Sequence, residues 1–313
     1  MHQDMPPKPL VILAAKAHSV LIEALQNAGY KPLQLLPDDS GWEDSIRQAT
    51  GIIVASGLII DDFFLSKSVN LKWIARLGSG MELIDIAAAE NRGIKVYSSP
   101  EGNSLAVGEH ALGMLLSLLH RITSSSNEIM QGKWIRDANR GTELSGKTVG
   151  IIGFGHTGKA FAKVLSGFDV TILAHDKYIS GFGWGNIRES SKEEVLANSD
   201  VISLHLPLTA ETLHYANDTF FKKLRKQPVL INTSRGEIHN MKDLIEALNH
   251  KMISGVALDV LENEKLSTYQ DHEKAALDDL LKRQNVLITP HIAGYSHEAF
   301  YKMSHVLAEK LGL

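Results

Sequence analysis

Short apolar runs alternate with segments of helical periodicity along the whole chain. Parallel strands that helices cover on both faces appear as continuous apolar runs, so each run is a candidate buried strand. Five candidates come in the first third of the chain, at residues 10–14, 33–36, 51–55, 72–77 and 95–97. Six more form a second series, at residues 148–152, 170–173, 201–204, 229–231, 255–258 and 286–288. This alternation is typical of βαβ units and predicts an α/β fold with two doubly wound parallel sheets.

The longest helical pattern, residues 104–130, lies between the two series. Asn103 or Ser104 is the expected N-cap, because either side chain can accept a hydrogen bond from the first turn. Charged residues and histidines interrupt the pattern, and its longest stretch without them, residues 111–119, is far shorter than the ~18 residues that a membrane span needs. We therefore expect no contact with a membrane. The first ten residues have no basic segment and no long apolar run, so they are not typical of a signal peptide.

Composition narrows the possible classes of function. The chain has 313 residues, enough for about two domains. Its 32 Lys and Arg residues nearly balance its 36 Asp and Glu residues, for a net charge of −4. This balance offers no basic footprint for a nucleic-acid backbone, so no nucleic-acid partner is expected. The absence of cysteine excludes disulfides and cysteine-held metals. No H-E-x-x-H motif occurs, and we expect no metal site and a cytoplasmic location.

Residues 153–158 spell G-F-G-H-T-G, which matches the G-x-G-x-x-G pattern of dinucleotide-binding turns. The pattern alone is weak, but it follows the apolar run 148–152 and opens a helical segment, which is the order that the motif requires. Gly153 would permit the tight turn, Gly155 would let the backbone approach a pyrophosphate, and Gly158 would pack the helix against the strand. The sequence therefore predicts a dinucleotide at the N-terminus of this helix.

Asp176 follows the next apolar run, 18 residues after Gly158. A carboxylate at this place accepts hydrogen bonds from the adenosine ribose and repels a 2′-phosphate, so NAD is expected rather than NADP. Asp176 could instead be an ordinary turn residue, and the neighbouring Lys177 weakens the preference for NAD. Upstream, residues 141–148 spell the G-x-x-x-x-G-K-T of a nucleotide P-loop. Because they lead into a strand rather than a helix, we interpret them as a turn.

Arg235, Glu264 and His291 each follow one of the last three strands of the second series. In an open α/β sheet, the carboxyl ends of the strands line one crevice. An arginine binds a carboxylate bidentately and polarises a neighbouring carbonyl. A histidine exchanges a proton near neutral pH, and a carboxylate orients that histidine. Taken singly, each residue also has an ordinary structural interpretation. Arg235 could form a surface ion pair, Glu264 could be a solvated loop acid, and His291 could be a core histidine. Together they favour hydride exchange between a 2-hydroxy acid and its keto acid.

Nine stretches resemble the D-isomer-specific 2-hydroxyacid dehydrogenases, a family that includes D-3-phosphoglycerate, glycerate and D-lactate dehydrogenases. They are RLGSG at 76–80, 92–94, 102–105, 132–134, 141–155, HLPLT at 205–209, NTSRGEI at 232–238, 255–260 and TPHIAG at 289–294. The resemblance covers nearly the whole chain and is greatest to the D-3-phosphoglycerate dehydrogenases, in a short form without a regulatory domain. It implies a Rossmann NAD-binding domain, residues 105–289, inserted into a flavodoxin-like substrate domain formed by residues 1–104 and 290–313.

The resemblance also implies a role for each candidate site residue. Arg235 would clamp the substrate carboxylate and carbonyl, His291 would be the acid–base, and Glu264 its carboxylate partner. The implied substrate-binding residues are Ser79, Gly80, Asn103 and Arg76. The implied cofactor-binding residues are Gly153, Gly155, His156, Thr157, Gly158, Asp176, His205, Pro207, Thr233, Ser234, Asp259 and Gly294. A small 2-hydroxy or 2-keto acid is the expected substrate, and a homodimer is expected by analogy.

Two departures from the family pattern bear on function. Glu264 is followed by Lys265 where the family usually has proline, which leaves open how the loop presents the carboxylate. Ala55 stands where phosphoglycerate dehydrogenases have an arginine that meets the substrate phosphate, so an unphosphorylated acid such as glyoxylate or hydroxypyruvate is expected. D-3-phosphoglycerate dehydrogenase proper is the alternative. A non-catalytic, NAD-sensing protein of the corepressor kind is another, although the retained Arg235 and His291 argue against it.

Overall fold

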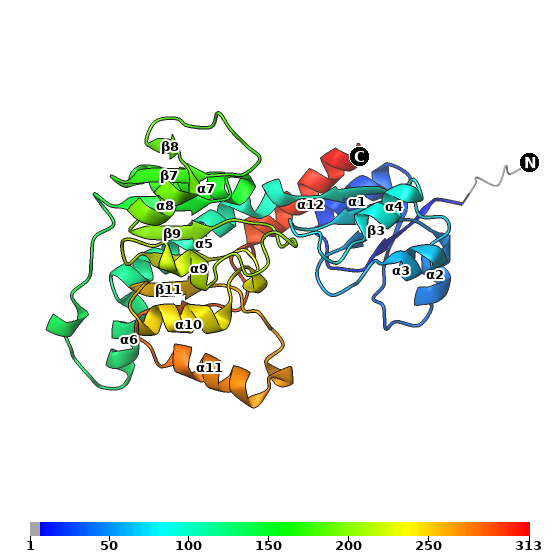
Figure 1. Cartoon of the computed structure of the whole chain (residues 1–313). Coiled ribbons are helices and arrows are strands. Elements are labelled where there is room, and N and C mark those ends of the chain that lie inside the picture. The colour runs from blue at the N-terminus through cyan, green and yellow to red at the C-terminus, as the bar shows by residue number, and fades with distance from the viewer. Residues whose placement is uncertain (1–6) are drawn as a thin grey trace, which may run out of the picture. The chain divides into compact units, whose positions relative to one another are not determined.

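The computed structural model describes residues 7–313, which form two compact units (Figure 1). Unit 1 consists of the described residues up to Ser104 together with Tyr295–Leu313, and unit 2 is Leu105–Gly294. The sequence predicts the second boundary between residues 289 and 290, but the structure places it after Gly294. The physical reason is that the backbone N–H groups of Ile292 and Ala293 donate hydrogen bonds to Asp259 of unit 2.

Unit 1 is built on a five-stranded parallel sheet with strand order β2-β1-β3-β4-β5, the order of flavodoxin-like folds. Its strands are β1 (Leu10–Leu13), β2 (Lys31–Gln34), β3 (Ala49–Val54), β4 (Trp73–Arg76) and β5 (Lys95–Ser98). Its helices are α1 (Ser19–Asn27), α2 (Trp42–Gln48), α3 (Asp62–Lys67), α4 (Ile86–Asn91) and α12 (His297–Leu311). Figure 1 shows α12, in red, beside α1. Leu307 and Ala308 of α12 belong to one buried cluster with Val11 and Leu21, so the C-terminal helix completes the core of unit 1.

Unit 2 is built on a seven-stranded parallel sheet with strand order β12-β11-β10-β9-β6-β7-β8. Its strands are β6 (Thr148–Ile152), β7 (Thr171–His175), β8 (Ile187–Glu189), β9 (Val201–Leu204), β10 (Val229–Asn232), β11 (Gly255–Leu258) and β12 (Val286–Ile288). Ile151 belongs to one apolar cluster and Ile152 to another, as expected for a sheet covered on both faces. The direction of winding reverses between β6 and β9, where ligands bind in open α/β sheets. The predicted fold class, a Rossmann-type sheet inserted into a flavodoxin-like one, is confirmed.

The helices of unit 2 differ from the prediction in the segment around residues 100–130. They are α5 (Pro100–Leu119, whose first turn lies in unit 1), α6 (Ile122–Met130), α7 (His156–Val164), α8 (Lys192–Asn198), α9 (Asp218–Lys222), α10 (Met241–Asn249) and α11 (Asp271–Leu281). The single helix predicted over residues 104–130 is wrong, because Arg121 adopts a left-handed backbone conformation with φ 55° and separates α5 from α6. Neither Asn103 nor Ser104 is an N-cap, since α5 begins at Pro100, a residue suited to the first helical position.

The part of the chain that the structure describes, residues 7–313, contains no helix that is long and apolar enough to cross a membrane. Within the same residues, no three His, Asp or Glu side chains are grouped so that they could hold a metal ion. The expectation of no signal peptide concerns the first ten residues, of which residues 1–6 lie outside the described part.

Candidate functional site

The glycine-rich turn joins β6 to α7 at the point where the winding reverses. Gly153 has φ +91°, and a Cβ there would lie 2.2 Å from the carbonyl oxygen of His205. A Cβ on Gly158 would lie 2.1 Å from the carbonyl oxygen of Gly153, whereas one on Gly155 would meet nothing within 4 Å. No side chain caps the N-terminus of α7. The turn therefore leaves open space in front of helix N–H groups that favour an anion, which fits a pyrophosphate.

Asp176, directly after β7, is hydrogen-bonded to the glycine-rich turn. One carboxylate oxygen accepts the N–H of Phe154 in the turn at 2.7 Å, and the other accepts the N–H groups of Tyr178 and Ile179 at 2.9 Å each. Partial burial opposes ionisation, but these hydrogen bonds outweigh it and lower the pKa of Asp176. The structure thus gives Asp176 a role in the turn, while its bond to a ribose stays a prediction.

Two buried polar atoms at the carboxyl ends of β9 and β10 have no hydrogen-bond partner within the described residues. They are Nδ1 of His205 and Oγ1 of Thr233. The other ring nitrogen of His205 lies 2.8 Å from Oγ of Ser203, and burial lowers the pKa of His205 to about 3, so the ring is neutral. Ser234, next to Thr233, donates its hydroxyl to the carbonyl of Leu204 at 2.7 Å. Unpaired buried polar atoms are rare in native proteins, and a ligand bound at these strand ends could satisfy them.

The turn after β10 carries Arg235. The Asn232 side chain accepts the N–H of Ser234 at 3.0 Å and donates to the carbonyl of Arg235 at 2.8 Å. Its amide nitrogen also lies 3.0 Å from Nδ1 of His239, a buried residue whose pKa is lowered by burial to about 4. A Cβ on Gly236 would lie 1.9 Å from a carbonyl oxygen of the loop after β11. The backbone around Arg235 is therefore held from both sides, by contacts that the sequence did not reveal.

His291 and Glu264 form a close pair although 27 residues separate them. Nδ1 of His291 lies 2.9 Å from each carboxylate oxygen of Glu264. Both side chains are about half exposed, and this pairing leaves Nε2 of the ring free for a reacting group. The intervening residues include α11 and β12. The observed pairing shows that Lys265, which replaces the proline usual in the family, does not prevent the contact.

Asp259 organises the loop that carries His291. Its buried carboxylate accepts the Thr289 hydroxyl and the N–H groups of Ile292 and Ala293, the latter two at 2.9 and 2.7 Å. Its backbone carbonyl accepts the N–H of His291 at 2.7 Å. These bonds hold His291 at φ 56°, a left-handed conformation that histidine adopts more readily than most residues. The structure shows that Asp259 positions the loop of His291. The role at the cofactor that the sequence suggests for Asp259 stays a prediction.

Comparison with known proteins decides the family. Residues 112–293 match the model of the NAD-binding domain of D-isomer specific 2-hydroxyacid dehydrogenases. The chain belongs to this family. Unit 2 is accordingly the NAD-binding domain of this family, and NAD is its cofactor. The open space at Gly155 and the unpaired atoms of His205 and Thr233 fit that cofactor.

Relatives in this family carry several activities. The chain is 34% identical over 274 residues to D-3-phosphoglycerate dehydrogenase of Archaeoglobus fulgidus, covering 86% of this chain and 50% of that protein. It is 37% identical over 259 residues to glyoxylate reductase of Thermofilum pendens, covering 80% and 74%. A solved D-lactate dehydrogenase of Aquifex aeolicus, in complex with NAD and lactic acid, aligns with a TM-score of 0.82, 26% identity and coverage of 97% and 94%. The chain thus spans about half the length of the phosphoglycerate dehydrogenase and most of the other two.

The predicted substrate-binding residues lie in unit 1. Arg76 ends β4, and Ser79 and Gly80 follow in the loop at its carboxyl end. Asn103 lies in the first turn of α5, where its Oδ1 is buried without a hydrogen-bond partner in the described part of the chain. A side-chain oxygen in this state is available to a ligand. The roles of these residues toward a substrate stay predictions.

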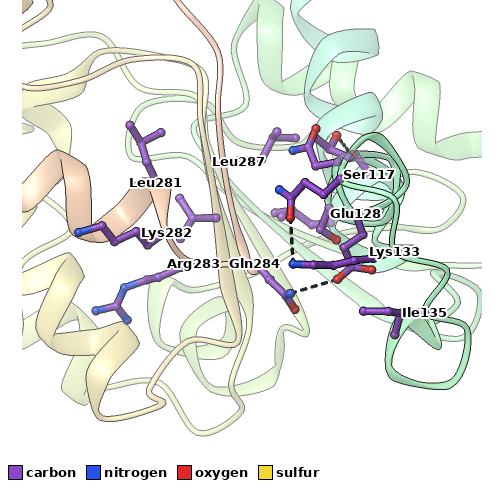
Figure 2. A pocket seen from close by; sticks show the side chains of 15 residues that line it. Ser117, Glu128, Lys133, Ile135, Leu281, Lys282, Arg283, Gln284 and Leu287 are labelled. Carbon is purple, nitrogen blue, oxygen red and sulfur yellow. Dashed lines mark hydrogen bonds between the residues drawn. The ribbon is translucent and has the colours of Figure 1, made fainter.

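A separate pocket of about 380 Å³ lies in unit 2, between α6 and the segment that joins α11 to β12 (Figure 2). None of the predicted site residues lines it. Its polar groups bond to one another, since Lys133 donates to Gln131 at 3.0 Å and Gln284 donates to Glu128 at 3.3 Å. We therefore do not assign the chemistry to this pocket.

The double role of Asp176 leads to a prediction for the cofactor. Asp176→Ala should narrow the preference for NADH over NADPH, because the carboxylate that repels a 2′-phosphate is lost. The variant should also bind NADH about tenfold more weakly, because the hydrogen bond to Phe154 is lost with the carboxylate. Asp176→Asn keeps an oxygen that can accept this N–H, so it should narrow the preference with a smaller loss of NADH affinity. Fluorescence titration with both nucleotides measures the two effects. Equal affinity of the unmodified protein for NADH and NADPH would contradict the assignment of Asp176.

Proposed function

We propose that the protein is an NAD-dependent D-2-hydroxyacid dehydrogenase that interconverts a small 2-keto acid and its D-2-hydroxy acid. The observation that carries the proposal is the pair of His291 and Glu264, with both carboxylate oxygens 2.9 Å from Nδ1, in an NAD-binding domain. NADH, when bound, supplies the hydride for reduction of the keto acid. His291 donates the proton from Nε2 to the keto oxygen, and Glu264 stabilises the protonated ring. Arg235 binds the substrate carboxylate and polarises the carbonyl.

We further propose that the substrate is unphosphorylated. A phosphate dianion needs charge-assisted donors, and Ala55, which follows β3 of unit 1, offers none at the place where phosphoglycerate dehydrogenases have an arginine. Glyoxylate and hydroxypyruvate are the expected substrates. Phosphoglycerate dehydrogenase proper remains the second candidate, supported by the 34% identity to such an enzyme and by Arg76, which occupies a position that is basic in the family.

The substrate proposal is tested by steady-state kinetics. We expect kcat/KM for glyoxylate or hydroxypyruvate to be at least equal to that for 3-phosphohydroxypyruvate. A large advantage for the phosphorylated acid would restore phosphoglycerate dehydrogenase as the function. Failure to oxidise NADH with any 2-keto acid would favour an NAD-sensing binding protein over an enzyme.

We also propose that the protein forms a homodimer in the cytoplasm. Helix α6 has no buried residue, and Ile122, Ile129 and Met130 of this helix are exposed, as is Trp134 just beyond it. Several exposed apolar side chains in one short segment favour an interface, and a second copy of the chain is the expected partner. Sedimentation equilibrium measures the mass in solution, and a monomer at micromolar concentration would contradict the proposal. The lack of cysteine agrees with a reducing compartment.

A further inference from the structure

One surface contact joins the segment after β7 to the loop after β9. Nζ of Lys177 donates to Oε2 of Glu211 at 2.6 Å, and the hydroxyl of Tyr178 donates to the same oxygen at 2.8 Å. Glu211 lies in the loop that begins with His205, and the backbone of Tyr178 is fixed by its bond to Asp176. A single glutamate therefore joins two of the loops that carry predicted cofactor residues.

The contact between Lys177 and Glu211 determines the net charge next to Asp176. In dinucleotide-binding units an acid at this place accepts the 2′-hydroxyl of the ribose, and a nearby basic residue instead receives the 2′-phosphate of NADP. Lys177, directly after Asp176, is the natural candidate for such a basic residue. The hydrogen bond to Glu211 raises the pKa of Lys177, and the bond to Lys177 lowers the pKa of Glu211. Both groups are therefore charged at neutral pH, and the positive charge of Lys177 is offset by Glu211.

We propose that Glu211 is a specificity-determining residue for the cofactor. Its hydrogen bond to Lys177 keeps that ammonium group from pairing with the 2′-phosphate of NADP. This inference rests on the proposed function as an NAD-dependent dehydrogenase. It resolves the conflict between Asp176, which predicts NAD, and Lys177, which weakens that prediction. Both side chains of the pair are more than half exposed, so the effect of releasing Lys177 is expected to be moderate.

The test compares nucleotide binding without turnover. In Glu211→Gln, titration followed by nucleotide fluorescence should show an NADPH affinity about three- to tenfold higher, with NADH affinity within twofold of the unmodified protein. Lys177→Gln alone should leave the ratio of the two affinities unchanged, but in the Glu211→Gln background it should abolish the gain. The gain should also shrink as ionic strength rises, because the contact between Lys177 and a 2′-phosphate is exposed to solvent.

Asp218→Asn is the matched control. It removes another exposed carboxylate of unit 2, which pairs with Lys222 at 2.6 Å, and it changes the net charge equally. An equal gain in NADPH affinity in this control would overturn the proposal, since the effect would then come from net charge alone. An unchanged affinity ratio in Glu211→Gln, with NADH still bound, would overturn the role of Glu211 and leave the proposed function standing. No binding of NADH by the unmodified protein would overturn both.

Discussion

Replacement of His291 by alanine is expected to lower kcat for keto-acid reduction by about 10²–10⁴, while NADH binds with unchanged affinity. The imidazole is the proton donor in the proposed reaction, and its Nδ1 is held by Glu264 at 2.9 Å. The affinity should be unchanged because the residues predicted to bind the cofactor are mainly those of the glycine-rich turn and its neighbours. NADH oxidation with glyoxylate measures kcat, and fluorescence titration measures the affinity.

The chain provides a closely matched control for this prediction. His214 also has a left-handed backbone, with φ 50°, and its ring pairs with the carboxylate of Glu262 at 2.8 Å. His214→Ala should therefore leave kcat within about threefold of the unmodified enzyme, because it removes similar local interactions without removing the proton donor. Near-normal turnover in His291→Ala would remove this histidine from the mechanism. Glu264→Gln should show an intermediate loss, since the amide cannot stabilise the protonated ring as the carboxylate does.

Arg235→Ala is expected to lower kcat by about 10²–10³ and to raise KM for the keto acid in the same variant. Both parameters should change because, in the proposed function, the guanidinium binds the substrate carboxylate in the ground state and polarises the carbonyl in the transition state. Arg235→Lys should recover only part of the loss, because lysine keeps the charge but not the planar pair of donors. Added guanidinium ion should partly restore turnover in the alanine variant.

Arg283→Ala serves as the control for the arginine. That guanidinium bonds Asp279 and Asn249 at 2.6 Å each, and it lies in the wall of the separate pocket of unit 2. The variant should leave kcat and KM unchanged within about twofold. A rise in KM for Arg235→Ala with kcat unchanged would show that Arg235 binds the substrate without acting on the reacting carbonyl.

The strands could be predicted where both faces of the sheet are buried. β6, β9 and β11 begin and end at the predicted residues, because each is a mostly apolar run in the interior of the seven-stranded sheet. The bounds of β12, at the edge of that sheet, were also predicted. The other two edge strands named here, β2 and β8, were harder to predict. β2 begins two residues before the predicted start, with Lys31 and Gln34 exposed, and the three-residue β8 was missed. The break at Arg121 was also missed, since a left-handed residue other than glycine gives no pattern of apolar positions.

The candidate site could be predicted by residue type and by position at strand ends, but not by its hydrogen bonds. The catalytic candidates lie in loops directly after strands, where the order of elements fixes their place. The bonds from Asp259 to the loop of His291, and from Asn232 to the turn of Arg235, depend on the path of each loop. A loop path depends on contacts between distant residues, which neither periodicity nor motif spacing records. The same holds for the bond between Asp176 and Phe154.

The insertion of unit 2 between the two parts of unit 1 sets an order for folding during synthesis. Unit 2 has emerged completely from the ribosome once Gly294 has left the exit tunnel, and domains generally fold as units. Unit 1 begins earlier but lacks α12, so the apolar surface that Leu307 and Ala308 cover stays open. Lys310 likewise supplies its bond to the carbonyl of Ser98 only at the end. The first domain to be translated is therefore the last to close, and the nascent chain carries an exposed apolar surface throughout the synthesis of unit 2.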